Sequence, residues 1–367
     1  MAKSCLELMT EAGLKPPKVL TLAITALCNL SCRHCWVDAD LDSSALQAQA
    51  AKVCRIMSEF AALGGRGLTL TGGEPLCHPD WPQIMRCARN LRFDRISLQT
   101  NAMLIEADHV ATLCELDFPG LSIQVSLDGA EAAAHDLIRG EGAFDRTVGA
   151  LQRLIRGGLG PRIVLFFTEM RHNLSQIPDL LQLAQDLGIS SVVAGSLVPY
   201  GRAGEDTTLA PAELKQYQEL IDRYESDARF RELYRELGQV AALEWYTARQ
   251  PGPDCCRFIE TPYLTAQGKL YPCVMFHCDE YALFDVFSKS LDAVYTEGVA
   301  LWRSLVQIKR SRSSRIPKCQ SCPDAPLCAA GCLGRAWGAS RDLLSVEDRC
   351  VLRREIYQRK KSSSFSN

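Results

Sequence analysis

Short apolar runs rich in β-branched residues alternate with longer segments of helical period over residues 18–198. The strand-like runs lie at residues 19–25, 67–71, 95–99, 121–126, 162–167 and 191–196. Helical segments lie between them at residues 44–63, 81–90, 108–116, 144–156 and 174–187. Such alternation predicts a parallel sheet with crossover helices. We therefore expect an α/β fold, a partial (β/α)6 TIM-like barrel whose functional groups lie at the carboxyl ends of the strands.

The pattern changes after this region. Residues 207–250 have the charged, amphipathic pattern of a helical connector, which the run Pro251-Gly252-Pro253 ends. A cysteine-rich segment follows, and the last residues are basic and then serine-rich, which predicts a flexible tail. The predicted parts are an N-terminal segment at 1–17, a core barrel at 18–205, a helical linker at 206–252, a small cysteine-rich domain at 253–352 and the tail at 353–367.

Composition narrows the class of protein. The chain has 367 residues, a hydrophobic fraction of 47% and a formal net charge of -2. A near-neutral charge disfavours nucleic acid as the main partner, because such binding needs a basic surface. The N-terminus lacks the pattern of a signal peptide, and no apolar run is long enough to span a membrane. We therefore expect a cytoplasmic protein whose clustered thiols stay reduced and hold metal.

The cysteines carry the candidate chemistry. Nine of the seventeen lie between Cys255 and Cys350, and three others stand close together as Cys28-x3-Cys32-x2-Cys35. An iron–sulfur cubane has four irons and normally takes four cysteine ligands. Three cysteines would leave one iron open for a ligand that is not protein.

A second motif follows the second predicted strand, where Thr71-Gly72-Gly73-Glu74-Pro75 stands. Together with the cysteine motif after the first strand, it resembles the radical S-adenosylmethionine (SAM) enzymes. In that family the three cysteines hold a 4Fe–4S cluster, and the open iron chelates the amino and carboxylate groups of SAM. An electron from the cluster cleaves the sulfonium, which gives a 5′-deoxyadenosyl radical that abstracts hydrogen from the substrate.

The resemblance also implies roles for particular residues. Gly72, Gly73, Glu74 and Pro75 match the segment that receives the methionine amino group. Cofactor contacts at the later strands are implied for four residues, namely Asn101, Ser126, Asp128 and Arg139. His34 occupies a position that is usually aromatic or apolar in the family.

The distant cysteines resemble the SPASM extension of these enzymes, which binds two auxiliary 4Fe–4S clusters. The outer-cluster positions match Cys319, Cys322, Cys328 and Cys350. The inner-cluster positions match Cys273 and Cys332, together with Cys255 or Cys256. The adjacent pair and the additional Cys278 leave the inner ligand set open, with four protein ligands or with three and an open iron. Tetrahedral zinc held by four thiolates is the alternative for cysteine knuckles of this kind.

Two further patterns are less specific. The segment Pro199-Tyr200-Gly201-Arg202-Ala203 resembles a Pro-x-Gly-Arg-Ala segment of the subfamily, and Arg202 is either a carboxylate ligand or an ordinary surface arginine. A basic run predicts a solvated helix face, with docking of an acidic partner as the alternative; it comprises Lys309, Arg310, Arg312, Arg315 and Lys318.

The resemblance implies an enzyme that cleaves SAM reductively and oxidatively modifies a peptide or protein, with a reducing partner such as flavodoxin or ferredoxin. Val274 follows Cys273, where sulfatase-maturing relatives carry an aspartate, which disfavours that activity. The second hypothesis is an enzyme acting on tetrapyrrole side chains in haem synthesis. A third, from another class, is a zinc-binding scaffold without catalysis.

Overall fold

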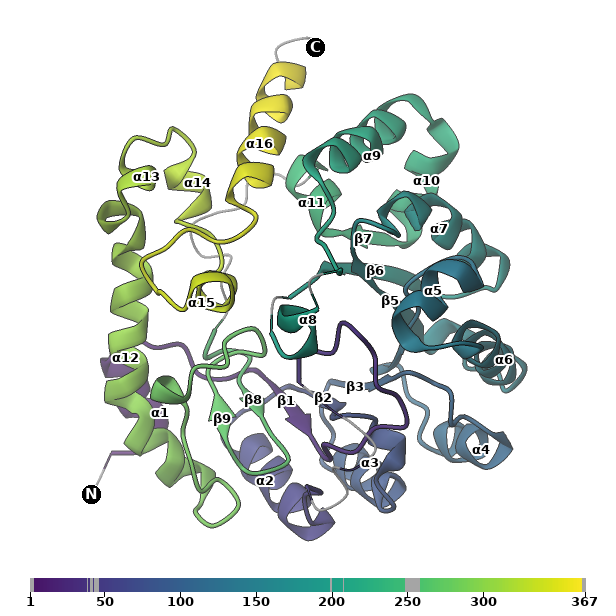
Figure 1. The fold of residues 1–367 in the computed structure, drawn as a ribbon. Helices are drawn as coiled ribbons and strands as arrows, with labels where there is room; N and C mark the ends of the chain where they lie inside the picture. The colour runs from purple at the N-terminus through teal and green to yellow at the C-terminus, as the bar shows by residue number, and fades with distance from the viewer. Residues whose placement is uncertain are drawn as a thin grey trace. The chain divides into compact units, whose positions relative to one another are not determined.

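The computed structural model describes residues 3–37, 39, 42, 46–198, 200–206, 208–247 and 258–364. The chain forms two compact units, and each combines separate stretches of sequence (Figure 1). The first unit comprises Met1–Leu27, Asp42–Ile96 and Gln250–Val351, and the second comprises Cys28–Leu41, Ser97–Arg249 and Leu352–Asn367. The domain boundaries expected from sequence follow continuous segments and stay predictions.

The first unit contains strands in the order β2-β1-β8-β9. β1 pairs in parallel with β2 in a register that runs from Val19 opposite Gly67 to Ala23 opposite Thr71. β8 pairs in parallel with β1, and β9 pairs antiparallel to β8. The strands are β1 (Val19–Ala23), β2 (Gly67–Thr71), β8 (Tyr263–Leu264) and β9 (Leu270–Tyr271). The helices are α1 (Cys5–Glu11), α2 (Ala50–Ala62), α3 (Trp81–Asn90), α12 (Leu291–Arg315), α13 (Pro317–Gln320), α14 (Ala325–Cys328) and α15 (Leu333–Ser340).

The second unit contains strands in the order β7-β6-β5-β4-β3, and the pairs from β4 to β7 are parallel. β3 begins in the first unit and ends in the second. The strands are β3 (Arg95–Thr100), β4 (Leu121–Ser126), β5 (Ile163–Glu169), β6 (Ser191–Ser196) and β7 (Gly238–Val240). The helices are α4 (Ala107–Glu115), α5 (Ala132–Arg139), α6 (Ala143–Arg156), α7 (Ile177–Asp186), α8 (Arg202–Glu205), α9 (Leu214–Ser226), α10 (Ala228–Leu237), α11 (Ala241–Thr247) and α16 (Cys350–Ser364).

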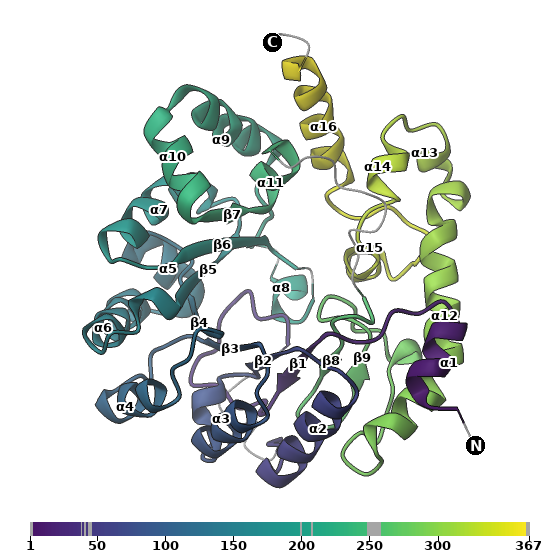
Figure 2. The same ribbon diagram turned by 180° about the vertical axis from the view of Figure 1, so that it is seen from behind.

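Alternation of buried and half-buried residues along the strands forms the core of the second unit. Ile123 and Val125 in β4 and Leu165 and Phe167 in β5 are fully buried, and the residues between them are half-buried. Successive side chains of a strand point to opposite faces, so these residues share one face of the sheet. Helices α5, α6 and α7 accompany strands β4, β5 and β6 in Figure 2. The α/β class, with parallel strands and crossover helices, is confirmed, and the strands form an open sheet.

Several local predictions differ from the structure. The helix predicted at 44–63 begins only at Ala50, because residues 46–48 pair with residues 24–26, just after β1, through Ala26 N–H to Leu46 O and Ala48 N–H to Ile24 O. The prediction also missed α5 and β7.

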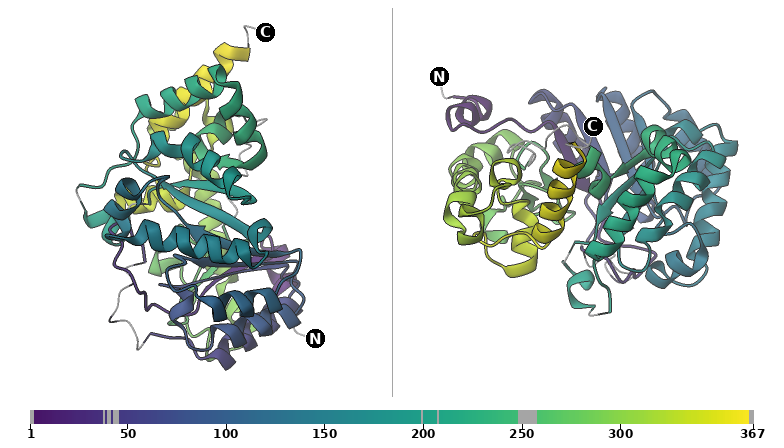
Figure 3. Two further views of the ribbon diagram at one scale, coloured as in Figure 1. Left: turned by 90° about the vertical axis from the view of Figure 1, so that its right-hand side faces the viewer. Right: turned by 90° about the horizontal axis from the view of Figure 1, so that it is seen from above.

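The flexible tail predicted from residue 353 is instead the helix α16. Its Ile356 and Tyr357 side chains are buried. Within the second unit Arg359 donates to the carboxylate of Asp222 on α9 at 2.6 Å, and Figure 3 shows α16 in yellow beside the teal helices. None of the helices in the described part of the chain is long and apolar enough to cross a membrane.

Arg312 corrects the interpretation of the basic run as a solvated face. Its side chain is fully buried. It donates to the carbonyl oxygens of Leu343, Gly331 and Ser345 at 2.9, 3.0 and 2.6 Å. Irregular backbone carries carbonyl groups that need donors when they are buried, and a guanidinium offers several in a fixed geometry. Arg312 therefore supports the loops on both sides of α15.

Replacing Arg312 should destabilise this region. Arg312→Ala removes the donors of three carbonyl groups, and we expect the free energy of unfolding to fall by about 3 kcal/mol. Arg310→Ala, at an exposed position of the same helix, should change it by less than about 0.5 kcal/mol. Denaturant unfolding followed by circular dichroism measures both. Equal midpoints for the two variants would show that the three bonds contribute nothing.

Candidate active site

The cysteine loop, which we define as residues 28–39, belongs to the second unit. Cys28 and Cys32 are buried and Cys35 is half-buried, and none of the three is in a disulfide. The backbone N–H of Cys35 donates to Cys32 O at 3.2 Å, which makes a tight turn between the two thiols. Three reduced thiols are therefore present on one short segment.

Two nitrogen donors lie near these thiols. Asn101, just after β3, places Nδ2 3.9 Å from Cys28 Sγ and 2.8 Å from Asn29 Oδ1. Arg139, the last residue of α5, places Nη1 3.9 Å from Cys32 Sγ. Burial raises the pKa of Cys32, and the Arg139 charge acts against that rise. Donors and a positive charge beside sulfur favour the thiolate, which is the form that binds metal.

Asp128, two residues after β4, has no exposed surface. Its Oδ2 accepts from Arg139 Nε at 2.7 Å, and its Oδ1 accepts from Thr168 N–H at 2.8 Å. Its carbonyl oxygen accepts from Asn173 Nδ2 at 2.9 Å, and its N–H donates to His135 Nδ1 at 3.0 Å. Although burial acts to raise the pKa of Asp128, the Arg139 charge and these neighbours hold it well below its usual range.

Two buried histidines adjoin this pair. His34 Nε2 lies 3.3 Å from Asp128 Oδ2 and 3.3 Å from Arg139 Nη2. Burial lowers the pKa of His34 to about 4, and it lowers the pKa of His135 to about 4 together with the Arg139 charge. His135 Nδ1 accepts the Asp128 N–H, so the neutral ring carries its proton on Nε2. Both rings are neutral at pH 7, and Asp128 and Arg139 carry the charges.

In the first unit the Gly-Gly-Glu segment contacts the chain that leads into the cysteine loop. Gly73 N–H donates to Thr25 O at 2.8 Å, and Glu74 N–H donates to Leu27 O at 2.8 Å. A Cβ at Gly73 would lie 2.4 Å from Leu27 O. Glu74 is buried, and its Oε1 accepts from Leu76 N–H at 3.1 Å. The glycine permits this close approach of two backbone segments.

The C-terminal cysteines of the first unit lie on α13, α14, α15 and the loops around them. Burial and then the Cys350 and Cys322 thiols raise the pKa of Cys319. Glu347 ties two cysteine segments together, because its Oε2 accepts from Cys332 N–H at 2.8 Å and its carbonyl accepts from Cys350 N–H at 3.1 Å.

The other cysteines of this region are distributed differently. Cys278 is buried with Phe276, Leu305 and Leu333, and Cys273 packs against this cluster. Cys328 is half-buried at the end of α14. Cys255 and Cys256 lie outside the described residues. Among the described residues, no three His, Cys, Asp or Glu side chains lie where they could share one metal ion.

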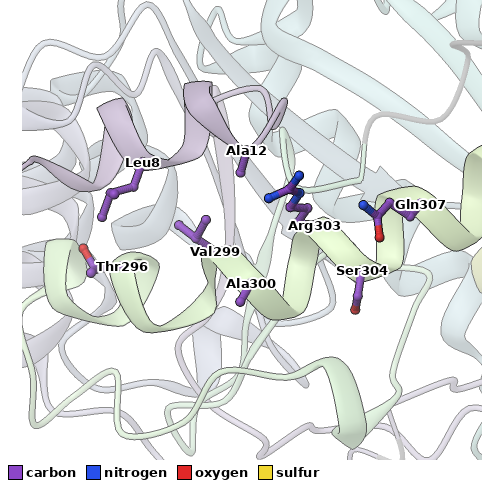
Figure 4. Close-up of a pocket in the computed structure, with 8 residues that line it drawn as sticks. All are labelled: Leu8, Ala12, Thr296, Val299, Ala300, Arg303, Ser304 and Gln307. Atoms are coloured by element: carbon purple, nitrogen blue, oxygen red, sulfur yellow. The ribbon is translucent and has the colours of Figure 1, made fainter.

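A groove of about 510 Å³ lies between α1 and α12 of the first unit. Leu8 and Ala12 of α1 lie across from Val299 and Ala300 of α12, with Arg303 beside them (Figure 4). No residue assigned to a cofactor by the sequence lines this groove.

Comparison with known proteins agrees with these features. Residues 22–184 match the family model of the radical SAM superfamily. Residues 22–184 thus form a radical SAM domain. Such a domain implies a 4Fe–4S cluster and SAM as cofactors.

Similar proteins extend over nearly the whole of this radical SAM chain. The AdoMet-dependent heme synthase of Methanosarcina barkeri is 27% identical and covers 92% of this chain and 97% of its own. The mycofactocin maturase MftC of Mycobacterium tuberculosis is 27% identical, and the match covers 93% of this chain and 84% of the maturase. The solved structure of anSMEcpe with bound AdoMet and Cp18Cys peptide has a TM-score of 0.72 at 16% identity. The match covers 96% of this chain and 99% of that chain, and it shows a shared fold.

The cysteine loop of this radical SAM protein fits a cluster. It offers three thiols outside any disulfide, nitrogen donors beside two of them and a buried positive charge. The other residues to which the resemblance assigns the cofactor are distributed over both units: Gly72, Gly73, Glu74 and Pro75 in the first, and Asn101, Ser126, Asp128 and Arg139 in the second. Ser126 ends β4 on the half-buried side of the strand. Their roles toward SAM stay predictions.

Sequence reasoning missed His135 and Asn173. Both are buried polar residues that hold the backbone of Asp128. Neither stands in a recognisable motif, since their common partner comes from another segment of the chain. The structure also gives Arg202 a definite partner, because its Nε donates to Cys32 O at 3.0 Å.

Gly73→Ala should disrupt the close contact between the backbone at Gly73 and the backbone of residues 26 and 27. The new Cβ would lie 2.4 Å from Leu27 O and 2.6 Å from Ala26 O, and both are backbone atoms. We expect a loss of more than about 2 kcal/mol in the free energy of unfolding. Gly149→Ala is the matched control, because it lies inside α6 with no atom closer than 3.9 Å and should stabilise by about 0.5 kcal/mol. Similar unfolding midpoints for the two variants would contradict this account.

Stability should fall as the solution becomes acidic, in part through His135. Its pKa lies at about 4 in the folded protein and near 6.5 in the unfolded chain, so the unfolded chain binds more protons between these values. The free energy of unfolding therefore falls as pH drops from 6.5 to 4, by up to about 1.4 kcal/mol per pH unit for this group. His135→Asn keeps a hydrogen-bond acceptor without a titrating ring and should flatten that dependence. Denaturant titrations at several pH values measure the slope, and parallel slopes would exclude the contribution.

Proposed function

We propose that this radical SAM protein is a maturase-type enzyme that modifies a peptide or protein. Three cysteines on one loop, with Asn101 beside the Cys28 sulfur and Arg139 beside the Cys32 sulfur, carry the proposal. A 4Fe–4S cluster held by Cys28, Cys32 and Cys35 would supply the electron that cleaves SAM. Mycofactocin maturase MftC, the relative similar over most of the chain, supports a peptide substrate.

The protein's own groups would prepare this site. Arg139 holds a positive charge beside Cys32, and the buried Asp128 carboxylate fixes its direction. A guanidinium held in this way presents its remaining donors to a carboxylate, which agrees with the expected contact to the methionine part of SAM. Asn101 orients Asn29 and Cys28 on the same loop. The buried, neutral His34 and His135 add no further charge at pH 7.

Two auxiliary clusters complete the proposal. The outer set would be Cys319, Cys322, Cys328 and Cys350, of which Cys319 is buried and the other three are half-buried. The inner set would include Cys273 and Cys332, with Cys255, Cys256 or Cys278 as further candidates. Their expected role is to take the electron left on the product or to bind a substrate group.

An acidic flavodoxin or ferredoxin is the proposed reductant, in a cytoplasmic setting. Lys318 on α13 and Arg315 and Arg310 on α12 are exposed and precede Cys319 along the chain. Opposite charges speed the encounter of redox proteins.

A tetrapyrrole substrate is the second candidate. The similar heme synthase of Methanosarcina barkeri favours it. Arg202 is the candidate carboxylate ligand from the sequence and could hold a tetrapyrrole carboxylate, but its Nε and Nη2 donate to backbone carbonyls at 3.0 and 2.7 Å. Those two donors are occupied within the protein, so we favour the peptide.

The first test is reductive SAM cleavage. Anaerobically reconstituted protein with dithionite should form 5′-deoxyadenosine and contain about twelve irons per chain. Cys28→Ala should abolish the product, whereas Cys114→Ala, at an exposed free thiol, should keep it. A colourless protein with one or two zinc ions and no 5′-deoxyadenosine would favour the zinc scaffold. Mass analysis of candidate peptides and porphyrins after turnover separates the two substrate classes.

A further inference from the structure

An arginine from a distant part of the sequence bonds the cysteine loop at two points. Arg202, the first residue of α8, donates through Nε to Cys32 O at 3.0 Å and through Nη2 to Ala39 O at 2.7 Å. These carbonyls stand seven residues apart and enclose Cys35. One planar side chain thus fixes both ends of the segment that carries the second and third thiols.

A second tether acts on the same loop. Arg33, next to Cys32, donates through Nε to Asp206 Oδ2 at 2.9 Å, and its side chain also bonds Thr208 Oγ1. Its backbone N–H donates to Ile138 O at 3.0 Å. The segment 202–208 therefore bonds to the loop in both directions, as donor from Arg202 and as acceptor at Asp206.

The elements that supply these bonds are themselves firmly placed. Ile138, Met170, Leu197 and Ala203 are buried together in one apolar cluster. Gly201 turns the chain into α8 with a φ of 53°, which favours glycine. Because the start of α8 packs in this apolar cluster, Arg202 is fixed in position, and its hydrogen bonds can restrain the loop.

We propose that Arg202 is a positioning residue that clamps the cysteine loop and sets the spacing of Cys32 and Cys35 for the cluster. The inference rests on the proposed cluster at Cys28, Cys32 and Cys35. The segment follows β6 at the carboxyl end of a parallel strand, the edge where α/β proteins bind substrates. The clamp therefore connects that edge of the second unit directly to the thiol-bearing loop.

Amide hydrogen exchange of the full chain tests the clamp itself. Arg202→Gln loses the paired, charge-assisted bonds, and we expect the amides of residues 32–39 to exchange about tenfold faster. Arg202→Lys keeps the charge but cannot reach two carbonyls with a planar fork, so it should recover only part of the protection. Arg156→Gln is the control. Arg156 is exposed at the C-terminal end of helix α6 in the same unit, and its substitution should leave the exchange of these amides unchanged.

The reconstituted holoenzyme tests the consequence for the cofactor. The Arg202→Gln variant should show a raised KM for SAM and a weaker response of the reduced-cluster electron paramagnetic resonance signal to SAM, at an unchanged melting temperature. Asp206→Asn, at a partly exposed tether, should give a smaller change in the same direction. Asp206→Asn also tests the proposal if Arg202→Gln does not fold.

Three results would overturn the proposal. Unchanged exchange in residues 32–39 would show that the bonds do not restrain the loop. Faster exchange throughout the chain of Arg202→Gln would show that Arg202 stabilises the whole fold. Full protection of residues 32–39 in Arg202→Lys would show that the positive charge alone is sufficient. The exchange experiment needs neither SAM nor a peptide, so a failure of the proposed function would be seen separately in the 5′-deoxyadenosine assay.

Discussion

The buried ion pair between Asp128 and Arg139 is the interaction on which the second unit's site depends. Removing two charges from water is expensive, and the cost is recovered only when every remaining group is hydrogen-bonded. Asp128 meets this requirement with partners on β5, on α5 and on the loop that carries Asn173. Breaking the pair would leave an uncompensated buried charge. The pair therefore holds these segments and the cysteine loop in one arrangement.

Polar side chains perform the same task elsewhere in the protein. Arg202 holds the carbonyls of the cysteine loop, Arg312 holds those around α15, and Glu347 accepts the N–H of Cys332. Cys28, Cys32, Cys35 and Cys332 stand in irregular backbone, which cannot satisfy its own hydrogen-bonding groups. Charged side chains from neighbouring elements supply the missing partners. This explains why several charged residues of the protein are fully buried.

The predictions that depended on local pattern were accurate. The strands at 67–71, 121–126 and 191–196 have the predicted bounds, because alternation of buried and half-buried positions is a local property. The predicted helix at 44–63 was too long, since pairing of residues 46–48 with residues 24–26 overrides helical period there. The tail was misjudged for a similar reason, as its few apolar residues are buried against other elements in α16.

The sequence by itself determined the α/β class and the identity of the cysteine motifs, because both depend on spacing along the chain. The tertiary structure alone decided which groups surround the thiols. Asn173 and Arg202 reach Asp128 and Cys32 across 45 and 170 residues of sequence, and His135 reaches Asp128 from the following helix. The local pattern marked Arg202 but not its partners. Their placement follows from the need to satisfy buried polar groups, and that need arises only when the chain is folded.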